Sequence, residues 1–160
     1  MGYDMHVVDE NGNNVEGEDT YRRRNIRGGG AQADKLVQLG MAEWSAPGYD
    51  RGRFPERPAH TLEAYKKAED AEDWDYEHPD YAAILHPYLK DRRGSTHGIT
   101  ADKLCDSNDG WWVTKEECQE ALEAWEKAGR PDVDDFGDGP IGDTIPFLKV
   151  AAEHHGFRVW

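Results

Sequence analysis

The sequence lacks the features that place a small protein in the secreted or membrane classes. Among its 160 residues only Cys105 and Cys118 are cysteines, and two thiols do not make the disulfide framework of a small secreted domain. No apolar run approaches the length of a membrane span, and the N-terminal residues lack the basic and apolar segments of an export signal. We therefore expect a soluble, cytoplasmic protein with free thiols and no membrane partner.

Positive charge is scarce as well. The chain has 19 Lys and Arg against 33 Asp and Glu, a formal net charge of -14 at pH 7. Such a charge repels nucleic acids and anionic lipids at long range and favours a basic partner. The mean hydropathy of -0.94 is low, but the 17 aromatic residues (6 Trp, 7 Tyr and 4 Phe) supply bulky apolar surface that disordered chains lack. The sequence thus predicts an acidic, folded protein without direct nucleic-acid binding.

Familiar catalytic and nucleotide motifs are scarce too. The arginine- and glycine-rich segment over residues 22–30 contains neither the Gly-Lys-Ser or Gly-Lys-Thr of a phosphate loop nor a G-x-G-x-x-G pattern, and none of the seven histidines belongs to an H-E-x-x-H motif. His6 could act with distant carboxylates in a hydrolase, and Cys105 could be a nucleophile, but no base can be assigned to either. The sequence therefore does not decide whether the chain is an enzyme.

Two acidic loops imitate calcium-binding loops without matching them. In residues 106–116 the glycine and the closing carboxylate are correctly spaced, but that register puts Cys105 where an oxygen ligand is needed. Residues 132–143 hold five aspartates, yet Phe136 and Ile145 fall at positions that require ligands. We predict no metal site and no cofactor, and calcium binding by these loops is left open.

The first third of the chain reads as strand, turn, strand and helix. Period-two alternation predicts strands over residues 3–7 and 21–26, separated by a turn at Asn11-Gly12. Gly28-Gly29-Gly30 is expected to break the second strand and to lead into a short helix over residues 32–39. This order indicates a hairpin followed by a helix.

The rest of the chain alternates helices with short strands. Residues 45–58 form a loop by composition. The patterns predict one helix from Thr61 toward Trp74 and a second from Pro79, which Pro87 kinks or splits. A third helix is expected from the Thr114 and Glu117 capping box to Gly129, and a fourth from Asp143 or Thr144 to Gly156. Strands are expected at residues 111–113 and 157–160. We therefore predict a single α+β domain over residues 1–160, with a small mostly antiparallel sheet covered by four or five helices.

Three segments carry a resemblance to known sequences: Gly2-Tyr3-Asp4-Met5-His6, Ser107-Asn108-Asp109-Gly110-Trp111 with the following Thr114-x-x-Glu117-Cys118, and Phe147-Leu148 with Gly156-Phe157-Arg158-Val159-Trp160. Together they resemble small uncharacterised proteins of actinobacteria and their bacteriophages. The resemblance implies an actinobacterial or phage-encoded protein, and a phage-encoded one would act in the host cytoplasm. It brings no activity and no site residues, and Arg22-Arg23-Arg24 stands where the similar chains are more apolar.

One candidate ligand site lies at the end of the second predicted strand. Three arginines there precede three glycines and a helix start, namely Arg22, Arg24, Arg27, Gly28, Gly29 and Gly30. Guanidinium groups, open backbone N–H groups and the positive end of a helix suit a phosphate. The alternative is that the arginines pair with carboxylates of their own chain. This segment therefore predicts either a small phosphate-ligand (nucleotide) binding protein or hydrolase, or a structural cluster.

The second candidate is an acidic surface in which aromatic residues interleave with carboxylates. Its residues are Glu69, Asp70, Glu72, Asp73, Trp74 and Tyr76. Acids steer a basic partner, and aromatic side chains make desolvated anchors in an interface. The same pattern could imitate the charge of DNA, or be an ordinary solvated helix face. From this surface and the missing catalytic motifs, we predict a non-enzymatic interaction protein that binds a basic protein.

Overall fold

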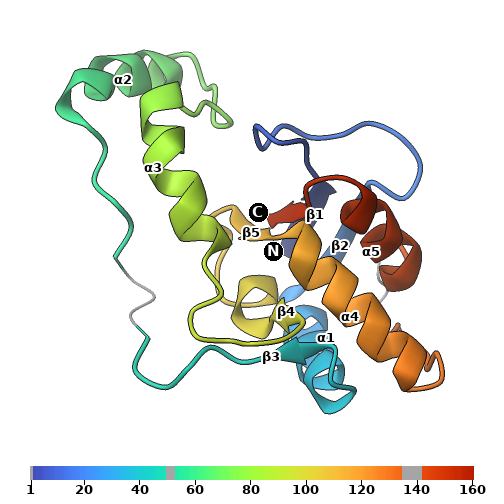
Figure 1. Ribbon diagram of the computed structural model, residues 1–160. Coiled ribbons are helices and arrows are strands. Elements are labelled where there is room, and N and C mark those ends of the chain that lie inside the picture. Colours follow the sequence, from blue (N-terminus) through green and yellow to red (C-terminus); the bar gives the residue numbers. More distant parts are fainter. Residues whose placement is uncertain (1, 50–52, 135–141) are drawn as a thin grey trace. The chain divides into compact units, whose positions relative to one another are not determined.

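The computed structural model describes residues 2–49, 53–134 and 142–160 (Figure 1). The chain divides into two compact units, Met1–Tyr49 with Arg92–Trp160, and Asp50–Asp91. The predicted α+β class is confirmed, since the described residues form five α-helices and a four-stranded antiparallel sheet. The single domain stays a prediction, and each unit is described by itself.

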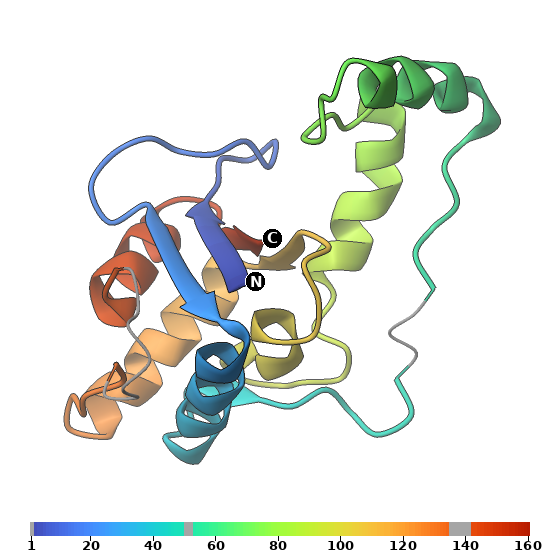
Figure 2. The same cartoon turned by 180° about the vertical axis from the view of Figure 1, so that it is seen from behind.

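The sheet of the first unit contains β1 (Gly2–Val7), β2 (Tyr21–Asn25), β5 (Trp111–Val113) and β6 (Phe157–Val159). The strands lie in the order β2-β1-β6-β5, and every neighbouring pair is antiparallel. Met5 pairs with Arg22 on one side and with Val159 on the other. The first and last strands of the chain are therefore neighbours in the middle of the sheet, and Figure 2 shows β1 beside β2 from behind.

Three helices accompany this sheet. Helix α1 (Ile26–Gln38) contacts β1 and β2, while α4 (Lys115–Lys127) and α5 (Thr144–Glu153) pack against each other. Helix α5 also contacts β1 and β2. The predicted capping box is confirmed, because Thr114 and Glu117 exchange side-chain to backbone hydrogen bonds at the start of α4. None of the described helices has the length and apolar character needed to cross a membrane.

The prediction that the three consecutive glycines break the strand and precede the helix is wrong. They lie inside the first turns of α1. Asn25 ends the strand and caps the helix, since its side-chain oxygen accepts a hydrogen bond from Gly28 N at 2.6 Å. A Cβ on Gly29 would lie 2.9 Å from Cδ2 of Tyr3, so a bulkier residue would push the helix off β1. Gly29 thus allows close packing of α1 on β1.

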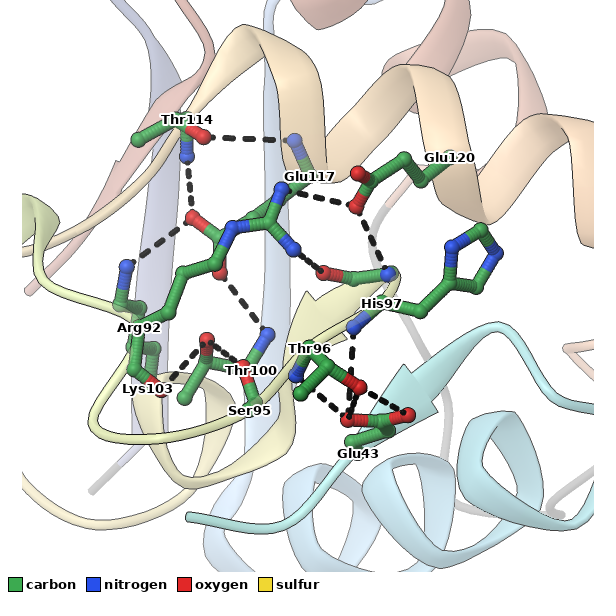
Figure 3. A network of polar contacts seen from close by, with 11 residues as sticks. Glu43, Arg92, Ser95, Thr96, His97, Thr100, Lys103, Thr114, Glu117 and Glu120 are labelled. Atoms are coloured by element: carbon green, nitrogen blue, oxygen red, sulfur yellow. Dashed lines mark hydrogen bonds and ion pairs between the residues drawn. The ribbon is translucent and has the colours of Figure 1, made fainter. Parts of the chain in front are cut away.

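A buried ion pair lies beneath a second, smaller sheet. That sheet pairs β3 (Ala42–Glu43) with β4 (Ile99–Thr100) in parallel, and a 3-10 turn, η2 (Ala101–Leu104), follows directly. Within η2, Lys103 places its Nζ 3.0 Å from Glu117 Oε2 (Figure 3). It also donates to the Trp112 carbonyl at 2.8 Å, and both charged side chains are fully buried. Burial lowers the pKa of Lys103, and the charge of Glu117 opposes that change.

The Glu117 carboxylate has further donors. Its Oε2 accepts from Thr114 N at 2.7 Å, and its Oε1 accepts from Thr100 N at 2.9 Å. One side chain of α4 therefore holds β4, η2 and the end of β5. Such a pair is strongly coupled, because removing one partner leaves the other charge buried.

Glu43 holds the turn that precedes β4. Its carboxylate accepts from Thr96 N at 2.6 Å and from His97 N at 3.3 Å (Figure 3). The Thr96 backbone bond is the main cause that lowers the pKa of Glu43 below its usual 4.5. The turn is therefore tied to the ionised form of this carboxylate.

The second unit contains η1 (Ala59–Thr61), α2 (Leu62–Asp70) and α3 (Pro79–Lys90). The helix predicted to run toward Trp74 ends at Asp70, and Glu72 then takes a positive φ of 55°, which a helix cannot continue. Thr61 makes no capping bond and instead donates to the Pro58 carbonyl at 2.7 Å. Helix α3 includes Pro87 without being split.

We expect Lys103→Met to lower the free energy of unfolding by about 3–5 kcal/mol, because the Glu117 carboxylate would lose its direct cation inside the protein. Urea unfolding followed by circular dichroism measures this. The double variant Lys103→Met/Glu117→Gln should recover part of the loss, and Lys127→Met on the exposed end of α4 should change stability by less than about 0.5 kcal/mol. A Lys103→Met protein as stable as the wild type would contradict the coupling.

We expect Glu43→Gln to cost about 1 kcal/mol at pH 7 and progressively less below pH 4.5. A carboxyl whose pKa is lower in the folded state stabilises the fold above its unfolded pKa, and this contribution disappears as the pH falls through the folded value. Urea unfolding of both proteins at pH 7 and pH 3.5 tests the sign, with Glu10→Gln as the exposed control. An equal difference at both pH values would rule out the ionised carboxylate as the cause.

Candidate functional site

The predicted phosphate segment forms a buried cluster on β2. Arg22 and Arg24 lie on the buried face of the strand, with 3% and 1% of their side chains exposed. Arg24 donates to Asp134 Oδ1 at 2.6 Å, and Arg22 donates to Gln32 Oε1 at 2.8 Å. Arg24 Nε reaches the same Gln32 oxygen at 3.3 Å. Both guanidinium groups are thus held by side chains of the same chain.

Gln32 and Asp134 connect this cluster to the start of α5. The amide nitrogen of Gln32 donates to Thr144 Oγ1 at 2.6 Å and to the Val133 carbonyl at 3.0 Å. Asp134 accepts from Thr144 N at 3.0 Å and from the Thr144 hydroxyl at 2.6 Å. The cluster therefore joins β2, α1 and the N-terminus of α5.

The cluster holds two guanidinium groups close to the Asp134 carboxylate. Burial is the main cause that lowers the pKa of Arg22 to about 9, and the neighbouring Arg24 acts in the same direction. Asp134 and Asp143 oppose it. Among the described residues, Arg22 Nε is buried and makes no hydrogen bond. The positive charge is costly here, and Asp134 is the carboxylate that compensates it most directly.

The remaining residues of the phosphate prediction are dispersed. Arg27 is exposed on α1, and Gly28 to Gly30 lie within that helix rather than in an open loop. The Asn25 side chain already occupies the Gly28 N–H. The structure thus brings Arg22 and Arg24 together and leaves Arg27 apart, which favours the structural alternative; phosphate binding stays a prediction.

The acidic surface lies in the second unit, at the end of α2 and in the connection to α3, and consists of Glu69, Asp70, Glu72, Asp73, Trp74 and Tyr76. Its four carboxylates are exposed, and Trp74 is 74% exposed. Tyr76 is half-buried and packs edge-on against Tyr65, with ring centroids 5.2 Å apart. All six residues therefore come from one short stretch of chain, and five of them face solvent.

Local hydrogen bonds fix this stretch. Asp73 N donates to the Ala68 carbonyl at 2.9 Å, which closes the end of α2. His78 N then donates to the Tyr65 hydroxyl at 2.9 Å, and the His78 ring caps α3 by accepting from Asp80 N. The connection between the helices is thus held at both of its ends.

Histidines pair with two acids near the start of α3. His60 Nε2 lies 2.7 Å from Asp80 Oδ2, and this hydrogen bond is the main cause that lowers the pKa of Asp80. His86 Nε2 lies 2.7 Å from Glu77 Oε1. By contrast, the four carboxylates of the acidic surface and Asp75 form no ion pair with any of the described residues. Their charge is available to a partner.

The remaining candidates from the sequence are metal ligands and the two thiols. No group of three His, Cys, Asp or Glu within residues 2–49, 53–134 and 142–160 could hold a metal ion. Cys105 and Cys118 are free thiols, and burial raises the pKa of Cys118 well above its usual value. Asp135, Phe136 and Asp138 of the second calcium candidate lie outside the described residues. Comparisons with protein-family models, curated proteins and solved structures found no match.

We expect Arg24→Ala to lower the free energy of unfolding by about 3 kcal/mol, because it leaves Asp134 without its closest cation. Thermal and urea unfolding measure the loss. Arg27→Ala, at an exposed position of α1, is the matched control and should change stability by less than about 0.5 kcal/mol. If inorganic phosphate instead raises the Tm of the wild type saturably and Arg24→Ala abolishes that rise without unfolding, the cluster is a ligand site.

Proposed function

We propose that this protein binds a basic protein through the acidic surface. The observation that carries the proposal is the exposure of Trp74 within a run of exposed carboxylates. A tryptophan buries a large area when it enters an interface, and it is among the residues that dominate binding energy. Because 74% of Trp74 is exposed in its own chain, a partner is the natural source of its further burial.

The charge around Trp74 selects the sign of that partner. Residues 69–80 contain seven Asp and Glu and no Lys or Arg. A field of one sign raises the rate at which an oppositely charged protein arrives and disfavours other partners. The proposal therefore names a surface rich in lysine and arginine.

Three of these acids, Glu69, Asp70 and Glu72, stand at positions that disfavour the local structure. Glu69 and Asp70 are the last residues of α2, where the helix dipole already places partial negative charge. Glu72 follows in the left-handed region, which a residue other than glycine adopts at some expense. Local choices that oppose stability are characteristic of functional positions.

We expect the variant Glu69→Gln/Asp70→Asn/Glu72→Gln/Asp73→Asn to bind a labelled nine-arginine peptide at least about tenfold more weakly than the wild type. Fluorescence anisotropy measures the affinity at two salt concentrations, and the wild-type affinity should fall with salt. Trp74→Ala should weaken binding by a factor that salt changes little.

The matched control removes four exposed charges from the first unit, in the variant Glu10→Gln/Glu16→Gln/Glu18→Gln/Asp19→Asn. Its net charge equals that of the test variant. If the two variants lose affinity equally, binding follows total charge and the acidic surface has no special role. A wild type that binds no peptide removes the proposal altogether.

A further inference from the structure

A cluster of tyrosines next to the acidic surface already holds a cation. The rings of Tyr65 and Tyr76 lie 5.2 Å apart, and those of Tyr65 and Tyr81 lie 6.0 Å apart, both edge-on. The Arg57 guanidinium carbon lies 3.9 Å from the centroid of Tyr65 and 5.9 Å from that of Tyr81. An aromatic face attracts a cation electrostatically, and guanidinium groups suit such faces best.

The hydroxyl groups of two of these rings are used to hold the rings in place. Tyr65 accepts from His78 N at 2.9 Å, and Tyr81 donates to the Pro55 carbonyl at 2.7 Å. Burial is the main cause that raises the pKa of Tyr65 and Tyr81; the negative charge of Glu77 acts in the same direction, while the charge of Arg57 opposes it. The ring faces are therefore fixed and lie in the field of a carboxylate, as a cation-binding site requires.

Arg57 itself is held weakly. It is exposed, and no ion pair to a residue of the described ranges involves it. Its contact with Tyr65 is a cation–π contact at an exposed site, which is one of the weaker interactions of a folded protein. A second guanidinium group could replace it at little cost, since the rings would keep their hydrogen bonds.

We propose that the faces of Tyr65 and Tyr81 form a seat for an arginine side chain of the basic partner, and that Arg57 occupies this seat until the partner displaces it. This inference rests on the proposed function, because Tyr76, which packs edge-on against Tyr65, belongs to the acidic surface. The acids attract the partner by charge alone, whereas the seat distinguishes arginine from lysine. Arg57 is then an internal competitor.

The test is a gain of binding, which an unfolded variant cannot imitate. Arg57→Gln should bind a labelled nine-arginine peptide about two- to fivefold more tightly than Lys66→Gln, the range expected for one cation on an exposed ring. Lys66 is exposed and adjacent to Tyr65 in α2, so its variant carries the same net charge. The gain should persist in Arg57→Gln/Tyr65→Phe, which keeps the ring, and disappear in Arg57→Gln/Tyr65→Leu. It should be smaller for a nine-lysine peptide.

A second readout follows Arg57 directly. In a ¹⁵N-labelled protein, the Arg57 Nε–H signal should move to the position of a solvated arginine when unlabelled peptide is added. Equal affinities for Arg57→Gln and Lys66→Gln, or an Arg57 signal that does not move, would overturn the seat. If the four-charge variant of the acidic surface still loses binding in that case, the proposed function stands without it. If neither the wild type nor Arg57→Gln binds the peptide, both fail.

Discussion

The first unit depends on the carboxylate of Glu117, because the start of α4, strand β4 and η2 meet at its two oxygens. It accepts from the backbone ahead of α4, from β4 and from the ammonium of Lys103. A buried carboxylate is tolerable only when its acceptor sites are filled, so the start of α4, the second sheet and η2 have to form together. The long Lys103 side chain also bonds the Trp112 carbonyl, which brings β5 into the same constraint.

The Lys103–Glu117 pair is part of a general difference between the charges buried in the protein and those on its surface. Within the described residues, the buried charged side chains include two anions, Asp102 and Glu117, and five cations, Arg22, Arg24, Arg93, Lys103 and Arg158. In a chain with a net charge of -14, the interior is thus relatively rich in positive charge, and the surface is more acidic than the composition alone indicates. The buried cations rest on carboxylates, carbonyls and aromatic faces, as Arg93 does 3.7 Å from the Trp111 centroid. The exposed acids are left to act on the surroundings.

Sequence patterns predicted the features that depend on neighbouring residues within one helix or strand. The Thr114 capping box was predictable because its partner Glu117 lies within the same helix turn, and the alternation of β2 was predictable because it is a pattern within one strand. The role of Gln32 and the pairing of Arg24 with Asp134 were not, since those contacts join residues far apart in the chain. The burial of Lys103 was not predicted either, because it depends on Glu117 of another element. The exposure of the carboxylates of the acidic surface was predictable, because charged side chains are mostly exposed. The contact of Arg57 with the Tyr65 ring was not predicted, because the sequence does not distinguish an arginine that stacks on a ring from any other arginine in a polar loop.

The position of β1 between β2 and β6 has a consequence for how the chain folds during synthesis. β1 pairs with β2 soon after both leave the ribosome, but its other edge pairs with β6, which is made almost a whole chain length later. Until then β1 has an open edge, and β5 has no strand to join, since it pairs through β6. Such an edge is a template for wrong pairing, and the delay makes the sheet slow to close. The nascent chain therefore exposes an unpaired edge of β1 until β6 emerges.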